Sequence, residues 1–189
     1  MTLPFAFLVA AGCLQSDPCR TVDAYLRALK AMDAARIESY IDPAYRARRA
    51  DGSEVPFHPA RNRSNRDFER ATRTRWKYSI LGIDGERITA LLSEDNEFYQ
   101  LLGTGVRTQV TLYAARNGRV YFTENFALVD ERGTYSTAVS AFTAWLKQQP
   151  AALSDPDILG EGNLVFSTAS GPKLVGWLKE YRKVRTDRP

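Results

Sequence analysis

The spacing of apolar residues changes along the chain from a helical period to a strand period and back. Ser16-Asp17-Pro18 places a capping side chain before a proline and predicts a helix start, and Val22 and Leu29 follow at helical spacing. Asp33 can cap a short second helix, which Asp42-Pro43 ends. Two helices are therefore predicted after residue 15.

A polar stretch and a third helix are predicted next. Residues 46–59 are mostly polar and contain Asp51-Gly52, which predicts a loop or a small hairpin. The third helix is predicted over residues 64–73, because Ser64 and Asp67 fit a capping box with Asp in place of the usual Glu.

The middle of the chain has the period of two that is typical of β-strands. Trp76, Tyr78 and Ile80 alternate with polar residues, and Asp84-Gly85 and Asn117-Gly118 are dipeptides of tight hairpin turns. The three further strands are predicted over residues 88–92, 108–115 and 119–128. Strands joined by such short turns predict an antiparallel sheet.

Beyond Gly133 the helical period returns. Phe142, Trp145 and Leu146 belong to one apolar stripe, and a last helix follows Gly171-Pro172. Helices, then strands, then helices indicate the α+β class.

Composition narrows the classes of function. The 189 residues have a formal net charge of +4 and a pI of about 9.1, and no basic run is interleaved with stacking aromatic residues, so no nucleic-acid partner is predicted. His58 is the only histidine and Cys13 and Cys19 are the only cysteines, which argues against a zinc site. We predict neither a metal nor a cofactor.

The first thirteen residues have the pattern of an export signal. Leu3 to Gly12 is a mostly apolar run, too short to span a bilayer, and small residues precede Cys13 as in a bacterial lipobox. We expect residues 1–13 to be a signal segment and Cys13 to anchor the protein to a membrane outside the cytoplasm. A cytoplasmic tail is the alternative, and a small Cys13–Cys19 disulfide loop is open if Cys13 carries no lipid.

Several short motifs stand in an order that one superfamily shares. They are Asp67-Phe68-Glu69 with Arg75-Trp76, Ile83 to Ile88, Glu94 to Tyr99, Thr111-Leu112-Tyr113, Arg116 to Arg119 and Ala144-Trp145-Leu146. Over roughly residues 20–184 the chain resembles the nuclear transport factor 2-like superfamily, in its SnoaL-like branch. The resemblance implies a cone-shaped, strongly curved antiparallel sheet wrapped around the N-terminal helices. The cone domain would comprise residues 16–130, and a C-terminal helical extension packed on it residues 131–189.

This resemblance, with the aromatic residues of the strands, implies a pocket for a small, largely apolar ligand. The expected lining residues are Tyr25, Trp76, Tyr78, Phe98, Thr111, Tyr113 and Phe126. Ketosteroid isomerase and the polyketide cyclases share the cone and use a carboxylate or a His–Asp pair inside it. A cofactor-independent isomerase, dehydratase or cyclase is therefore the alternative function. Sheets of this superfamily often dimerise through their outer faces, which makes a homodimer a further expectation.

Glu124 is the candidate catalytic residue. Apolar residues occupy every second position from Val120, and Glu124 stands in this series between Phe122 and Phe126. We therefore expect it on the apolar face of its strand. A carboxylate in an apolar pocket has a raised pKa and can act as a general base. A structural glutamate that pairs with an arginine or caps a loop is the alternative.

Two charged segments are further candidates. Arg63, Arg66, Arg70 and Arg73 recur on one face of the third helix and could bind an anionic ligand, a phosphate or a lipid headgroup. A solvated face paired with acidic neighbours is the alternative. The acidic run over residues 94–97 could bind a divalent cation, but it lacks the spacing of a calcium loop and is expected to be a solvated loop.

Overall fold

The computed structural model describes residues 16–49, 52–129 and 135–186, and it divides into two compact units. Unit 1 consists of Met1–Asn62, Trp76–Ser93 and Thr108–Val129. Unit 2 consists of Arg63–Arg75, Glu94–Arg107 and Asp130–Pro189. The second unit thus takes two segments from within the predicted 16–130 domain.

The two predicted N-terminal helices are confirmed. Helix α2 (Asp17–Lys30) buries Val22, Leu26 and Leu29 on one stripe. Helix α3 (Ala34–Ser39) begins at the predicted cap, because the Asp33 carboxylate accepts a hydrogen bond of 3.0 Å from the backbone N–H of Arg36. Asp33 therefore separates the two helices as its side-chain chemistry predicts.

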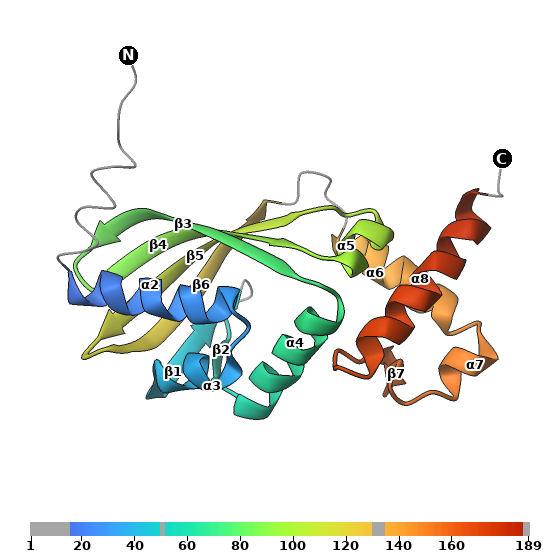
Figure 1. Cartoon of the computed structure of the whole chain (residues 1–189), viewed down its shortest axis with the longest axis horizontal. Helices are drawn as coiled ribbons and strands as arrows, with labels where there is room; N and C mark the ends of the chain where they lie inside the picture. Colours follow the sequence, from blue (N-terminus) through green and yellow to red (C-terminus); the bar gives the residue numbers. More distant parts are fainter. Residues whose placement is uncertain (1–15, 50–51, 130–134, 187–189) are drawn as a thin grey trace, which may run out of the picture. The chain divides into compact units, whose positions relative to one another are not determined.

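The sheet of unit 1 has six strands in the order β2-β1-β6-β5-β4-β3. They are β1 (Ile41–Arg48), β2 (Glu54–Pro56), β3 (Arg75–Asp84), β4 (Arg87–Asp95), β5 (Arg107–Arg116) and β6 (Arg119–Val129). Figure 1 shows β3 to β6 arching over α2. Residues of α2, β4, β5 and β6 share one hydrophobic core, so we call the side of the sheet that meets α2 the core face.

Strand β1 makes this sheet mixed rather than wholly antiparallel. It pairs antiparallel with β2, as the predicted hairpin requires, but parallel with β6. The sequence placed Ile41 in the second helix and 46–48 in a polar stretch. Strand β1 pairs with β6, which lies more than 70 residues further along the chain, so no local sequence pattern indicates this strand.

Strand β6 contains a β-bulge that reverses its alternation. Ala115 pairs with Val120, but the next residue, Ala114, pairs with Phe122, which leaves Tyr121 as an extra residue. Directly paired residues lie on the same side of a sheet, so Val120 is on the core face and Phe122 on the outer face. One extra residue therefore moves every later side chain of the strand to the opposite face until the next register shift.

Helix α4 (Pro59–Ala71) begins earlier than predicted. Ser64 lies inside this helix and donates a hydrogen bond of 2.6 Å to the backbone carbonyl of Phe166, so it is not the N-cap. Proline is favoured in the first turn of a helix, and Pro59 provides the earlier start. The predicted capping box at Ser64 is wrong for this reason.

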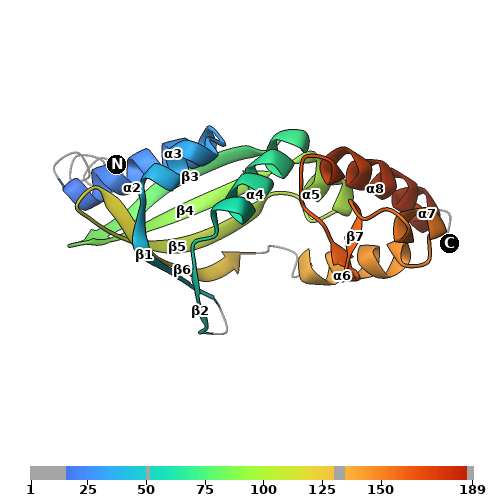
Figure 2. The same ribbon diagram turned by 90° about the horizontal axis from the view of Figure 1, so that it is seen from below.

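Unit 2 is mainly helical. Its elements after α4 are α5 (Glu97–Leu102), α6 (Tyr135–Leu146), α7 (Pro150–Leu153), the short strands β7 (Leu159–Gly160) and β8 (Asn163–Leu164), and α8 (Ser170–Thr186). Helices α5, α6 and α8 contact one another, and Figure 2 shows them gathered together. Their core centres on Phe98, Phe142 and Leu174, all fully buried. The rings of Phe68 and Phe98 meet edge to face with centroids 5.7 Å apart.

Candidate functional site

The core face of unit 1 carries an aromatic surface that α2 and the sheet share. Tyr25 of α2 packs against Tyr113 of β5, with ring centroids 5.7 Å apart. Trp76 and Tyr78 of β3 lie beside the same core and are only half-buried. The structure therefore brings these four predicted pocket residues, together with Thr111 of β5, to one side of the sheet.

A few polar groups stand within this aromatic surface. The hydroxyl groups of Tyr45 and Thr123 share a hydrogen bond of 2.5 Å and both residues are buried. The buried Thr111 hydroxyl donates to the side-chain oxygen of Asn125 at 2.9 Å. Burial raises the pKa of Tyr45, and the nearby Tyr25 adds to the rise, so the Tyr45 hydroxyl remains neutral. The surface is thus apolar with a few paired hydroxyl groups.

The Tyr78 hydroxyl marks the polar rim of this surface. It donates a hydrogen bond of 2.8 Å to the Asp23 carboxylate, which also pairs with Arg27. Burial and the Asp23 carboxylate raise the pKa of Tyr78. Charge is therefore found at the edge of the surface, while its interior holds neutral hydroxyl groups.

Two predicted pocket residues lie elsewhere. Phe98 is fully buried in the core of unit 2, where it contacts Phe68 and Phe142. Phe126 is 58% exposed on β6. Alternation along β6 does not extend to Phe126, because β6 and β5 shift register between Asn125 and Ala127.

Glu124 lies on the outer face of the sheet, so its predicted place on the apolar face is wrong. It pairs across the strands with Leu112, and one carboxylate oxygen lies 3.6 Å from Nη1 of Arg48. The Arg48 guanidinium also lies over the Phe122 ring, 5.2 Å from its centroid. The bulge at Tyr121 causes the exchange of faces. Glu124 is thus a strand residue that pairs with an arginine, and the isomerase hypothesis loses its base.

The four arginines of the third helix have different surroundings. Arg63, Arg70 and Arg73 are exposed, and Arg70 donates to Asp67 at 2.6 Å. Arg66 is buried and pairs with Glu69 one turn further along α4. The predicted face therefore combines an exposed part with a buried ion pair.

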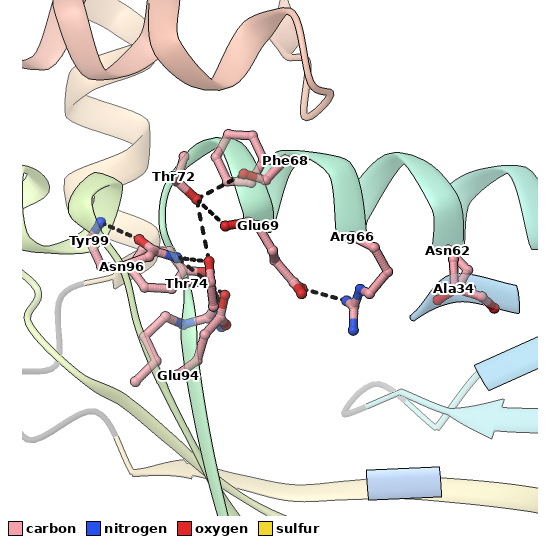
Figure 3. A network of polar contacts seen from close by, with 11 residues as sticks. Ala34, Asn62, Arg66, Phe68, Glu69, Thr72, Thr74, Glu94, Asn96 and Tyr99 are labelled. Carbon is pink, nitrogen blue, oxygen red and sulfur yellow. Dashed lines mark hydrogen bonds and ion pairs between the residues drawn. The ribbon is translucent and has the colours of Figure 1, made fainter. Parts of the chain in front are cut away.

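A buried polar cluster in unit 2 was missed by the sequence reasoning. It consists of Glu94, Asn96, Tyr99 and Arg107. The Glu94 carboxylate accepts hydrogen bonds from the Tyr99 hydroxyl at 3.2 Å and from the Asn96 amide at 3.3 Å. Arg107 donates to the Tyr99 hydroxyl at 2.8 Å. Figure 3 shows Glu94, Asn96 and Tyr99 close to the Arg66–Glu69 pair.

Local structure at the end of β4 assembles this cluster. Asn96 caps α5 by accepting a hydrogen bond of 2.8 Å from the backbone N–H of Tyr99. Gly103, at a φ of 86°, ends the helix and returns the chain to β5, which begins at Arg107. The cap and the glycine could have been read from the sequence as a short helix. The burial of Glu94 could not, because it depends on α4 and α6.

Burial dominates the electrostatics of Glu94. It raises the pKa of this carboxyl, and Arg107, Tyr99 and Arg66 oppose that rise. The expectation of a solvated loop at residues 94–97 is wrong for Glu94 and Asn96, which are both buried. A raised carboxyl pKa next to a tyrosine hydroxyl and a guanidinium is a pattern found at functional sites.

Within residues 16–49, 52–129 and 135–186, no group of three or more His, Cys, Asp or Glu side chains could hold a metal ion. No helix in the same ranges is long and apolar enough to cross a membrane. Cys19 is fully buried on α2 and disulfide-bonded. The predictions for residues 1–13, including lipidation of Cys13, lie outside the described residues.

Comparisons with known proteins give similarities of fold. No family model matches the chain, and no curated protein matches it by sequence. An uncharacterized cystatin-fold protein from Novosphingobium aromaticivorans is 16% identical, with a TM-score of 0.46 over 59% of this chain and 98% of the other. An LEH-like epoxide hydrolase from M. tuberculosis is 14% identical, with a TM-score of 0.43 over 58% and 76%. A nuclear transport factor 2-like protein of unknown function from Cytophaga hutchinsonii is 9% identical, with a TM-score of 0.40 over 56% and 85%. These neighbours include a member of the superfamily that the sequence resembles.

Proposed function

We propose that unit 1 binds a small, largely apolar molecule on the aromatic core face of its sheet. The observation that carries this proposal is the position of Tyr25, Trp76 and Tyr78. These side chains pack against the core cluster of unit 1 and yet stay half-buried, so each keeps ring surface that a ligand can cover. Ligand sites are typically apolar with a few placed polar groups, and here those groups are the hydroxyls of Tyr45, Thr111 and Thr123.

The chemistry of these groups sets the class of the ligand. The interior hydroxyls are neutral, and the Asp23–Arg27 ion pair lies beside Tyr78 at the rim of this surface. A buried charge on the ligand would lack a partner within the surface and would cost free energy. The proposed ligand is therefore uncharged, with an apolar body and at most a few oxygen atoms.

A fluorescence titration with the neutral dye Nile red tests this proposal. We expect saturable binding to the wild-type protein, and roughly tenfold weaker binding to Trp76→Leu, because an aromatic anchor contributes more than about 1 kcal/mol. Phe126→Leu is the matched control, since it also replaces an aromatic ring with leucine but at an exposed position. An equal loss of dye binding in the two variants, or no saturable binding by the wild type, would contradict the proposal.

Native mass spectrometry provides a second measurement that needs no dye. We expect the purified protein to carry an uncharged organic molecule that organic solvent extracts. An experimental structure in which side chains fill all the space around Tyr25 and Trp76 would overturn the proposal.

We further propose that the protein is exported. The apolar run of residues 3–12 supports export, and so does the disulfide at Cys19, because disulfides persist in oxidising compartments. Cell fractionation should find the protein outside the cytoplasm. A reduced protein in the cytoplasm would contradict export.

A further inference from the structure

Unit 2 brings together two arginines and two glutamates from different elements, and all of them except the partly exposed Arg107 are buried. Arg66 and Glu69 belong to α4, Glu94 ends β4 and Arg107 begins β5. Nη1 of Arg107 lies 3.7 Å from a carboxylate oxygen of Glu94, and the charges of Arg107 and Arg66 both lower the pKa of this carboxyl. Figure 3 shows Arg66, Glu69 and Glu94 within the same close view. The four charges therefore form a single electrostatic site.

The carboxylates of this site have donors, but the guanidinium groups have donor atoms to spare. Glu94 accepts from Asn96 and Tyr99, and Glu69 accepts from Arg66. The Nε atoms of Arg66 and Arg107 are buried and have no hydrogen-bond partner among the described residues. Buried donors in proteins are nearly always satisfied, so these two atoms call for an acceptor.

The neighbouring acceptors are already engaged. The Tyr99 hydroxyl accepts from Arg107 while it donates to Glu94. The Asn96 side-chain oxygen accepts from the backbone N–H of Tyr99. The Arg66 side chain is only 9% exposed, so bulk water does not satisfy it, whereas Arg107 at 22% leaves a path from solvent.

We propose that unit 2 binds a small organic carboxylate between Arg66 and Arg107, with its oxygens accepting hydrogen bonds from the two Nε atoms. A planar carboxylate matches the edge of a guanidinium group. The rings of Tyr99 and Tyr135 adjoin Arg107, whose guanidinium carbon lies 5.1 Å and 4.0 Å from their centroids, and they offer a surface to an organic body. This site lies in unit 2 and stands or falls separately from the ligand proposed for unit 1.

Charge balance favours a monoanion. With Glu94 ionised the four groups sum to zero, and with Glu94 protonated they sum to +1, which one carboxylate neutralises. The groups facing Glu94 are Arg107 of β5, Tyr99 of α5, Tyr135 of α6 and Arg66 of α4, with Glu69 paired to Arg66. Because burial raises the pKa of Glu94, affinity should increase as the pH falls toward that pKa.

Calorimetric titration of the full chain with benzoate tests this inference, with the neutral benzamide and inorganic phosphate as comparison probes. We expect saturable binding of benzoate alone. Arg107→Lys keeps the charge but removes Nε, and should weaken binding roughly tenfold to a hundredfold, the value of a charge-assisted hydrogen bond. Arg70→Gln changes an exposed arginine of α4, the helix that carries Arg66, and should leave affinity unchanged. Glu94→Gln should bind benzoate tightly with little dependence on pH.

Several outcomes would overturn it. These are preferential binding of phosphate, equal binding of benzamide, an equal loss in Arg70→Gln, or no binding by the wild type and Glu94→Gln. If Arg107→Lys fails to fold, NMR of the arginine Nε–H groups in the wild type decides. Two signals that move on addition of benzoate support the site, and signals that stay unchanged reject it.

Discussion

The two units of this protein accommodate polar groups in their interiors in different ways. Unit 1 buries hydroxyl groups that pair with one another, as Tyr45 and Thr123 do, and leaves the Arg48–Glu124 pair at its surface. Unit 2 buries ionisable groups, with Arg66 and Glu94 both largely inaccessible. A buried hydroxyl needs one partner, whereas a buried charge needs several, and its cost depends on pH. We therefore expect unit 1 to be insensitive to pH and unit 2 to respond to it.

The largest expected change in stability is at Phe98, which the sequence assigned to the same ligand pocket as Phe126. Phe98→Ala should lower the free energy of unfolding by about 3–5 kcal/mol, because it leaves a cavity in the core of unit 2. Phe126→Ala should change it by less than about 0.5 kcal/mol, since that ring is exposed. Urea denaturation measures both. Similar losses in the two variants would mean that Phe126 is also a core residue.

Two glycines of α8 offer a sharper test of packing in unit 2. A Cβ at Gly171 would lie 2.7 Å from the Cβ of Ala71, so Gly171→Ala should destabilise by about 1–3 kcal/mol. A Cβ at Gly176 meets nothing within 4 Å, so Gly176→Ala should stabilise by about 0.5–1 kcal/mol. Thermal unfolding of both variants measures the difference. The same sign of change in both would contradict the close approach of α4 and α8.

The dependence on pH tests the buried charge directly. Burial raises the pKa of Glu94 above its ordinary value of 4.5, so the folded chain holds this proton more tightly than the unfolded chain. The stability it contributes is complete below pH 4.5 and is lost as the pH rises through the raised pKa.

Glu94→Gln should therefore be more stable than the wild type at neutral pH, by about 1.4 kcal/mol for each unit by which the pKa is raised. Urea denaturation at a series of pH values measures this, with Glu97→Gln as the control from the same acidic run. A wild type whose stability does not fall over this window, relative to Glu94→Gln, would show that Glu94 is solvated.

The smallest expected change in stability is at the Arg48–Glu124 pair, which contains the predicted catalytic residue. Glu124→Gln should cost about 0–1 kcal/mol, and less at high salt, because Arg48 and Glu124 are partly exposed and 3.6 Å apart. Glu54→Gln removes the other partner of Arg48, at 2.9 Å, and is the matched control. If Glu124→Gln alone lowered the free energy of unfolding by several kcal/mol, Glu124 would have to be a buried residue.

Local chemistry allowed much of the fold to be predicted. Asp33 caps α3, and the β5–β6 turn has Asn117 and Gly118 at φ of 52° and 72°, the backbone that this dipeptide favours. Gly85, at a φ of 57°, joins β3 to β4 as expected. These signals lie within a few residues of the structure they determine, which is why sequence alone reveals them.

The errors share one physical cause, which is dependence on distant partners. Strand β1 pairs with β6, and buried Glu94 interacts with Arg66 of α4 and Tyr135 of α6, which lie far from it along the chain. The candidate site suffered most, since the assignment of Glu124 assumed an unbroken alternation that the bulge at Tyr121 interrupts. The aromatic residues of β3 were placed better, because that strand alternates between exposed and partly buried positions over most of its length.

The bulge at Tyr121 also decides which face of the sheet the following side chains of β6 occupy. Deleting this one residue would leave the composition of β6 almost unchanged, yet it would turn Thr123 out of its hydrogen bond with Tyr45 and turn Glu124 in among the aromatic rings. An insertion or deletion here is therefore a larger event than most substitutions. The face that a side chain of β6 occupies depends on whether an odd or an even number of residues precedes it in the strand, as much as on which residue it is.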